Sequence, residues 1–249
     1  MKSISRIFAL IKRNLKEILR DPLSLIFMIA MPLFMEVVFY FIFHGMTEQF
    51  EMKYLAPGIV GFAQAFLSLF SGILISLDRS SAFLTRLYVS RAKAPEFLLG
   101  YALALLPIAF AQSILFFLVG GIIDPSLFCV EMVWSILLSL FPALFFIGMG
   151  LLLGVLCNEK SIGGVSSILI AGQSMLSGMW FPPQGLNKGV LTAMKVLPFK
   201  NATDLLQAGF IGYEDAFTAF GRPILILLGY AALAFVVAIL VFRKKMREQ

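Results

Sequence analysis

The sequence predicts an all-α integral membrane protein, on the strength of its composition, its apolar runs and the placement of its basic residues. Of its 249 residues, 60% are hydrophobic and 14% are charged, and the mean hydropathy is +0.94. Soluble domains are typically about 45–50% apolar and about 25% charged. The composition therefore excludes a soluble globular domain. The 26 phenylalanines and the many aliphatic residues equally exclude a solvated, disordered chain.

Six apolar runs bounded by polar residues predict six transmembrane helices. A helix of about 20 residues crosses the roughly 30 Å hydrocarbon layer. The third and fourth runs exceed this minimum, so we expect tilt or a kink, and Pro107 and Pro142 are the natural kink sites. The predicted spans are residues 22–44, 55–77, 97–123, 132–156, 161–180 and 223–242.

The basic residues predict the orientation, because cytoplasmic loops carry an excess of Lys and Arg. If the N-terminus is inside, fifteen of the 20 basic residues fall on the cytoplasmic side. Both termini are then cytoplasmic, and the formal net charge of +6 does not indicate a nucleic-acid-binding surface, which needs one shared basic patch. The five basic residues on the opposite side are Lys53, Lys188, Lys195, Lys200 and Arg222.

Residues 1–21 predict an amphipathic helix that lies on the membrane surface. Apolar side chains from Ile4 to Leu19 recur at helical spacing, and the basic side chains occupy the other side. Asp21-Pro22 ends this helix, because a residue before proline avoids the α region. The helix either anchors the chain to anionic lipid or also contacts a cytoplasmic partner.

Short motifs occur along the chain in a fixed order. They are Tyr-Leu-x-Pro-Gly-Ile at 54–59, Asp-Arg at 78–79 followed by Leu-x-Arg-Leu at 84–87, Leu-Leu-Gly at 98–100, Ser-Gly-x-x-x-Pro at 177–182 and Pro-x-x-x-x-x-Asp at 198–204. With the amphipathic lead-in and six spans, this order resembles the ABC-2 type permeases, the membrane subunits of one class of ATP-driven exporters. The chain departs from the family at Ala82, where glycine is common, and at Arg91, where proline is common.

The resemblance implies a single ABC-2 type transmembrane domain over residues 1–249. It implies a homodimer, or a heterodimer with a related permease, whose cytoplasmic face docks two ATP-binding cassette ATPase subunits. The loop 78–96 mixes basic with apolar residues, which favours a coupling helix seated on the ATPase, with simple lipid contact as the alternative. The coupling residues implied are Asp78, Arg79, Phe83, Leu84, Arg86, Leu87, Tyr88 and Arg91.

No Gly-x-x-x-x-Gly-Lys-[Ser/Thr] loop occurs in the sequence, so energy must come from a separate polypeptide or from an ion gradient. The resemblance implies the first, with ATP and Mg bound by the partner ATPase and no cofactor bound by this chain. The chain is predicted to be non-catalytic, with one histidine and two cysteines and hence no predicted metal site. An intramembrane enzyme is the least favoured alternative, because nucleophile motifs and paired acids are missing. A secondary transporter or channel is the other alternative, and it usually carries internal repeats and several intramembrane charges.

Five polar residues are candidates for lining a substrate pathway. Glu36 is the only acid within a predicted span, and a charge in hydrocarbon is by default a functional hypothesis. The alternative is that Glu36 is protonated or hydrogen-bonded at a helix contact. The side-chain amides of Gln64, Gln112 and Gln173 likewise either bond a neighbouring helix or contact the substrate. The other candidates are His44, Gln64, Gln112 and Gln173.

The external segment 181–222 is too apolar for a solvated loop and too interrupted by Pro and Gly to span the membrane. Short re-entrant helices satisfy both observations. By resemblance they form the external gate, with Ser177, Gly178, Phe181, Pro182, Pro198 and Asp204.

Gly150 and Gly154 form a Gly-x-x-x-Gly pair in the fourth span, which packs either within the chain or across a dimer. The predicted location is the bacterial cytoplasmic membrane. The substrate class stays open among drug-like molecules, lipids, lipid-linked glycans and peptides.

Overall fold

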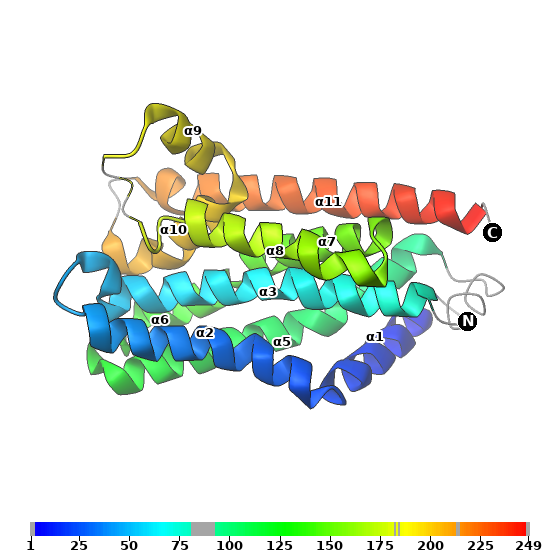
Figure 1. Ribbon diagram of the computed structural model, residues 1–249, viewed down its shortest axis with the longest axis horizontal. Helices are drawn as coiled ribbons and strands as arrows, with labels where there is room; N and C mark the ends of the chain where they lie inside the picture. Colours follow the sequence, from blue (N-terminus) through cyan, green and yellow to red (C-terminus); the bar gives the residue numbers. More distant parts are fainter. Residues whose placement is uncertain (1–2, 81–92, 182, 184, 213–214, 248–249) are drawn as a thin grey trace.

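The computed structural model describes residues 3–80, 93–181, 183, 185–212 and 215–247. All regular secondary structure within these residues is helical, which confirms the all-α prediction. The helices form an elongated bundle, in which the long helices run along one axis (Figure 1). The elements are α1 (Ser3–Leu19), α2 (Pro22–Phe43), η1 (Glu48–Phe50), α3 (Met52–Ser80), α5 (Ala94–Ile123), η2 (Pro125–Leu127), α6 (Val130–Leu138), α7 (Leu140–Leu156), α8 (Glu159–Leu176), α9 (Lys188–Val196), α10 (Pro198–Ile211), the π-helix η3 (Phe217–Gly221) and α11 (Arg222–Arg247).

Five helical stretches among the described residues are long and apolar enough to cross a membrane. They are Pro22–Phe43, Met52–Arg79, Ala94–Ile123, Val130–Leu156 and Phe217–Lys245. Several extend beyond the predicted spans, because hydropathy marks only the apolar part of a helix whose backbone hydrogen bonds continue into polar surroundings.

The sixth predicted span, 161–180, is not confirmed. Its helix α8 ends at Leu176, four residues early, and begins with Glu159 and Lys160. Serine, glycine and glutamine interrupt its apolar positions, so its hydropathy falls below that of the other five. α8 nevertheless runs beside the central helix α3 (Figure 1).

Helix α3 is the centre of the bundle and contacts α2, α5, α7, α8 and α10. Its closest neighbour is α7, and the Gly-x-x-x-Gly pair lies at this contact. A Cβ atom placed on Gly150 would lie 2.2 Å from the carbonyl oxygen of Ser68, and one on Gly154 would lie 2.5 Å from that of Gly72. The glycines therefore let two helix backbones approach within one chain.

The predicted fourth span, 132–156, is divided into α6 and α7 at Ser139. Pro142 accounts for the break, because its ring clashes with the carbonyl of residue 138 and it has no N–H to donate. The side chain of Gln64 donates to the Ser139 carbonyl at 2.9 Å, so the broken turn is bridged from α3. The other proline named above, Pro107, lies inside the continuous helix α5.

The described residues of 181–222 include two short helices and a π-helix. Helix α10 is buried on one face and contacts α3, α6, α8 and α11. Helix α9 stands at the edge of the bundle and contacts α10 (Figure 1). These helices fit the interrupted apolar pattern of the sequence, whereas their depth in a membrane stays a prediction.

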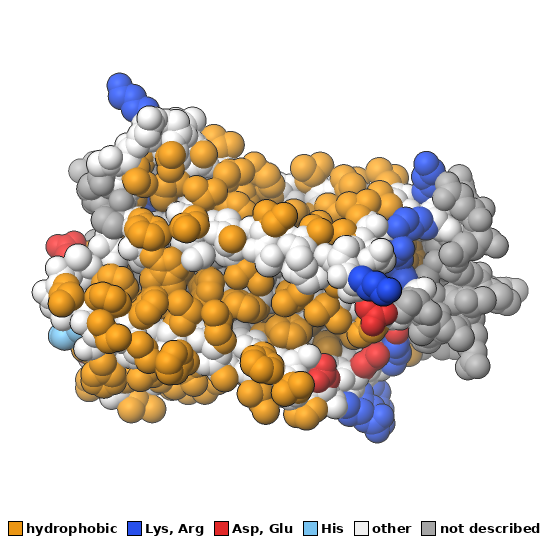
Figure 2. Space-filling view, viewed as in Figure 1, with side chains coloured by type: hydrophobic (Ala, Val, Ile, Leu, Met, Phe, Trp, Pro, Cys, Tyr) orange, Lys and Arg blue, Asp and Glu red, His pale blue; other side chains and the backbone are white. Residues whose placement is uncertain are grey.

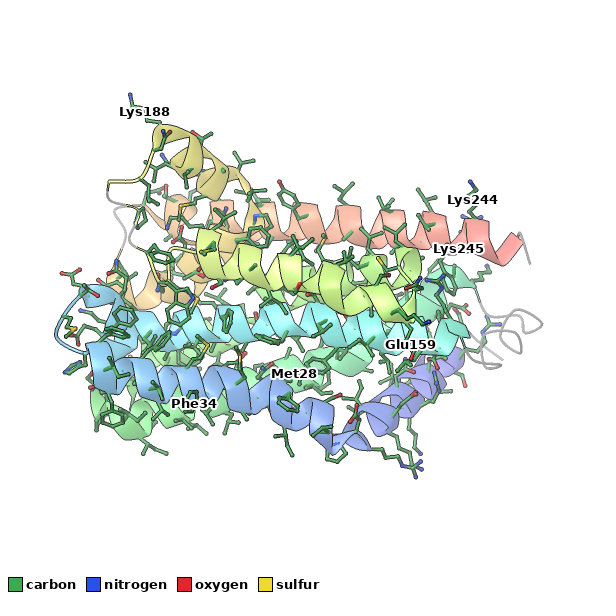
Figure 3. All side chains as sticks on the ribbon, in the orientation of Figure 1. Met28, Phe34, Glu159, Lys188, Lys244 and Lys245 are labelled. Carbon is green, nitrogen blue, oxygen red and sulfur yellow. The ribbon has the colours of Figure 1, made fainter. Side chains whose placement is uncertain are left out.

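Charged side chains gather at one end of the bundle. Figure 2 shows most of the blue and red side chains of this face at the end where α1 and the end of α11 lie. Lys244 and Lys245 are at this end, and Lys188 is at the opposite end (Figure 3). The middle of the bundle surface is predominantly apolar (Figure 2), as expected for a surface in contact with lipid.

Candidate coupling site at the charged end of the bundle

Helix α1 joins the bundle mainly through a face that lies beside its exposed apolar one. Leu10 and Asn14 are its buried residues, whereas Ile4, Phe8 and Leu19 are each at least 60% exposed. Leu10 packs on α5 at a position where a Cβ atom on Gly100 would lie 2.7 Å from the Leu10 Cβ. One face of α1 therefore binds protein, and its exposed apolar face is free to lie on lipid.

Arg13 of α1 forms an ion pair with Asp78 near the end of α3. Both guanidinium nitrogens donate to the carboxylate at 2.5 Å, and the Tyr101 hydroxyl of α5 donates to the same group. Asp78 is buried, so this charge-assisted geometry satisfies a carboxylate that water does not reach. Burial lowers the pKa of Arg13, but the hydrogen bond and charge of Asp78 outweigh it and raise this pKa overall.

A second ion pair joins α1 to the start of α5. Arg6 donates to Glu96 at 2.9 Å, and the hydroxyl of Ser3 donates to the same carboxylate oxygen. Glu96 also accepts from the backbone N–H of Lys93 at 3.2 Å, as a residue in the first turn of a helix does. Glu96 is buried, and α1 therefore holds the beginning of α5 as well as the end of α3.

The next residue along α3, Arg79, binds the end of α7. It donates to the backbone carbonyls of Gly154, Val155 and Cys157 at 2.7, 2.6 and 3.0 Å. Lys245 of α11 donates to the Val155 carbonyl at 2.6 Å. The last carbonyls of a helix lack partners inside the helix and carry partial negative charge, so two cations satisfy this terminus.

These contacts surround the two ends of the segment between α3 and α5. Asp78 and Arg79, the two implied coupling residues within the described part, touch α1, α5 and α7. The arrangement can transmit a displacement of this segment to three helices at once. The remaining implied coupling residues lie outside the described residues: Phe83, Leu84, Arg86, Leu87, Tyr88 and Arg91.

Sequence reasoning named Asp78 and Arg79 but missed Arg6, Arg13 and Glu96. A signal was present, because Asp78 and Glu96 are acids at the inner ends of two apolar runs on a basic side of the membrane. Carboxylates so placed need cationic partners, and the amphipathic helix carries several basic residues on the same predicted side of the membrane.

Glu36 and His44 share α2 but have separate surroundings. Glu36 is fully buried, neither of its carboxyl oxygens has a hydrogen-bond partner among the described residues, and a Cβ on Gly120 would lie 2.9 Å from its Oε1. His44 is exposed at the end of α2, stacks on Tyr40 and lies 3.5 Å from Glu51.

The three glutamines each join two helices in the interior. Gln64 of α3 donates to Ser113 of α5 as well as to Ser139, and Gln112 of α5 donates to the Met28 carbonyl of α2 at 3.1 Å. Gln173 of α8 donates to the Thr203 hydroxyl of α10 at 3.1 Å. Their arrangement is that of interhelical hydrogen bonds.

The implied gate residues lie around the end of α8 and the start of α10. Gly178 has a φ of +79°, a left-handed conformation suited to glycine, and the Ser177 hydroxyl accepts from the N–H of Met179. Pro198 begins α10 and is buried, and Asp204 pairs with Lys200 at 2.5 Å. Phe181 is 52% exposed, whereas Pro182 lies outside the described residues.

An aromatic cluster lies at this end and was not predicted from the sequence. Trp180 contacts Phe39, Phe50 and Phe62 edge-on or stacked, with ring centroids 4.7 to 6.4 Å apart. Its indole N–H donates to Ser174.

The described residues contain no group of three His, Cys, Asp or Glu side chains that could hold a metal ion.

The helical bundle with several membrane-spanning helices and a charged end defines an integral membrane protein. The family model described as ABC-2 type transporter matches residues 5–211, which is most of the chain. The chain therefore belongs to the ABC-2 type transporter family, whose members are generally non-catalytic membrane subunits that work with an ABC ATPase. A comparison with curated proteins gives no match.

Proposed function

We propose that the chain is the permease subunit of an ATP-driven exporter and that residues 78–96 couple it to a separate ABC ATPase. The observation that carries the proposal is that α1 holds both ends of this segment, through Arg13–Asp78 and Arg6–Glu96. ATP and Mg are bound by the ATPase partner, which contributes two subunits to a dimer of permeases.

Coupling follows from the contacts at the charged end. Closure of the ATPase pair on ATP moves the segment 78–96, and the ion pairs carry α1, α3 and α5 with it as a unit. Arg79 extends the same displacement to α7. The two permeases then open a route for a drug-like molecule, a lipid or a lipid-linked glycan to pass outward.

The proposed membrane placement has α8 as the sixth span and α9 and α10 as re-entrant helices that close the outer side. The buried face of α10 supports this, because backbone at membrane depth must be covered by protein. The charged end is cytoplasmic in the bacterial membrane, with both termini there, because Lys and Arg accumulate on that side.

Co-purification and reconstitution test the proposal. The permease, expressed with a candidate ABC ATPase, is expected to retain it through purification and to change its ATP hydrolysis rate in liposomes. An ATPase whose phosphate-binding Lys is replaced by Ala is the control and should bind without hydrolysis. A permease that transports alone in liposomes without ATP would be a channel or secondary transporter, and the proposal would be wrong.

Arg86→Glu tests the coupling assignment within the same system. It is expected to abolish transport-linked ATP hydrolysis while membrane insertion stays intact. Lys188→Glu makes the same charge change on an exposed residue at the opposite end of the bundle and should leave hydrolysis unchanged. Normal stimulated hydrolysis in the Arg86 variant would count against coupling through 78–96.

A further inference from the structure

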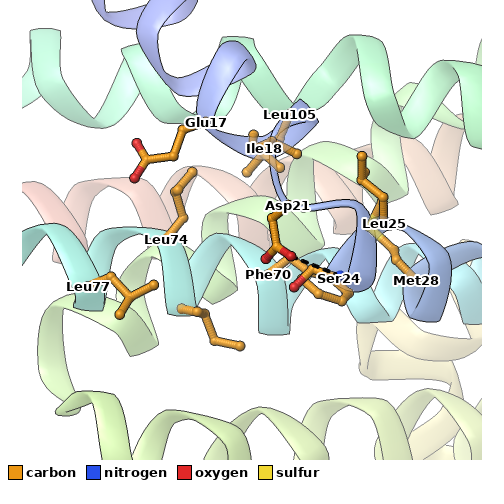
Figure 4. Close-up of a pocket in the computed structure, with 11 residues that line it drawn as sticks. Glu17, Ile18, Asp21, Ser24, Leu25, Met28, Phe70, Leu74, Leu77 and Leu105 are labelled. Carbon is orange, nitrogen blue, oxygen red and sulfur yellow. Dashed lines mark hydrogen bonds between the residues drawn. The ribbon is translucent and has the colours of Figure 1, made fainter.

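A cavity of about 220 Å³ lies in the elbow where α1 turns into α2, closed on its third side by α3. Figure 4 shows its walls, with Leu25 and Met28 contributed by α2 and Leu74 and Leu77 by α3. Phe70 completes the apolar wall. A concave, largely apolar cavity with a few polar groups is the usual form of a small-molecule site.

The polar lining of the cavity is acidic. Glu17 and Asp21 line it, whereas no Lys or Arg among the described residues does so. Asp21 accepts a hydrogen bond from the Ser24 N–H (Figure 4) and forms no ion pair within the described part of the chain. An apolar cavity with two carboxylates at its wall selects a positively charged head on an apolar body.

Among the described residues, the charged side chains of the packed elements around this elbow are mostly carboxylates. Arg13 pairs with Glu17 at 2.8 Å, but its other partner is Asp78 at 2.5 Å, so one guanidinium serves two carboxylates. Burial and the Asp78 charge raise the pKa of Glu17, against the opposing effect of Arg13. Asp21 adds a third carboxylate to the elbow. Lys16 and Arg20 are exposed on α1 and do not line the cavity.

We propose that this cavity binds an amphiphile with a positively charged head group, whose head lies against Asp21 and Glu17 and whose apolar body lies against α2 and α3. The position suits such a molecule, because the junction of a surface helix with a membrane span lies where head groups meet hydrocarbon. The idea that the bound amphiphile is also the exported substrate rests on the proposed function. The existence of the binding site does not depend on that function.

Two probes with the same tail and opposite heads test the assignment. Decyltrimethylammonium and decyl sulfate are titrated separately, as monomers, into the full chain in phosphatidylcholine nanodiscs, and binding to protein-free nanodiscs is subtracted. We expect the cation to bind and the anion to bind at least about tenfold more weakly, a difference typical of one charge contact. The proposal would be overturned if the two probes bind equally or if the anion binds more tightly. It would also be overturned if neither probe binds the native chain, as is expected when a second copy fills the elbow.

The variants Glu17→Gln and Asp21→Asn, singly and together, locate the head group. Asn caps a helix as well as Asp, so the second change removes charge and keeps the hydrogen bond to Ser24. We expect the double variant to lose the preference for the cation. Glu48→Gln, which removes an exposed acid in η1 beyond the opposite end of α2, is the matched control and should keep the preference.

Leu77→Phe locates the apolar body, because Leu77 is 40% exposed and a larger side chain there intrudes on the cavity without entering the core. It should weaken binding of decyltrimethylammonium with little loss of thermal stability. Unchanged cation binding in both this variant and the double charge variant would place the ligand elsewhere. These measurements need no ATPase, so failure of the proposed coupling would leave the result on the cavity standing.

Discussion

Arg13 of α1 and Asp78 of α3 are 65 residues apart in the chain and are joined by two hydrogen bonds of 2.5 Å. The pair makes the surface helix part of the bundle at the point where α3 ends. A helix that lay only on lipid would need an apolar face, but it would not need an ion pair with a buried carboxylate of another helix. The pair therefore ties α1 to α3, so the proposed function has these two helices move together.

Arg13→Ala should destabilise the protein by about 3 kcal/mol, because it removes from the buried Asp78 carboxylate a cation that donates two hydrogen bonds to it. Tyr101→Phe removes one of those donors and should cost about 1 kcal/mol. Unfolding of the purified protein in detergent, followed by circular dichroism, measures both. Lys12→Ala on the exposed side of α1 is the control, and equal stability of the Arg13 and Lys12 variants would contradict the assignment.

Arg79→Gln and Lys245→Gln should act together on the end of α7. Each change alone leaves the other cation on the Val155 carbonyl and should cost roughly 1 kcal/mol. The double variant removes both side-chain donors from this carbonyl, so its cost should exceed the sum of the two. A double-mutant cycle on unfolding free energies checks this expectation, and strict additivity would show that the shared carbonyl is unimportant.

Gly150→Ala should be costly, since its new methyl group would meet the backbone of Ser68 and the helices must separate. We expect a loss of about 1–3 kcal/mol. Gly163→Ala places the same methyl group on α8, where no other part of the described chain lies within 4 Å of it. The better helix propensity of alanine should stabilise the protein by up to about 1 kcal/mol. Thermal unfolding of the pair compares them. Equal stability would disprove the close contact.

Glu36→Gln should leave both fold and transport unchanged, because the described residues give this carboxyl no hydrogen-bond partner and it packs near Gly120, Leu127 and Met52. Glu36→Lys should prevent correct folding, since a cation at this fully buried position within the span is costly and no acid among the described residues pairs with position 36. Transport in liposomes is the measurement for the first variant and expression yield for the second. Lost transport with an intact fold in Glu36→Gln would instead assign a functional charge.

Much of the fold could be predicted from local pattern. Apolar runs predicted four spans that the structure contains as helices or helix pairs, together with α11, because burial in hydrocarbon demands long stretches of one kind of residue. The same criterion fails for α8, whose polar positions face neighbouring helices such as α10 through Gln173 and Thr203. Hydropathy reports the mean character of a helix and not which neighbour covers each side.

The candidate site was predictable only in part. Asp78 and Arg79 were identified through the family motif, since both stand beside the end of an apolar run. Their partners depend on which helices are adjacent, and spacing along the chain does not reveal that Arg13 lies against Tyr101. The aromatic cluster around Trp180 escaped notice for the same reason, because its members come from α2, η1 and α3.

The sequence by itself determined that this protein is a helical membrane protein with one strongly basic side, because composition and charge placement are properties of single segments. Only the tertiary structure decided which face of α1 meets protein, which carboxylates its arginines hold, and that the elbow before α2 is an acidic cavity. Those properties arise between segments, where helix packing sets the distances on which ion pairs, close glycine contacts and cavities depend.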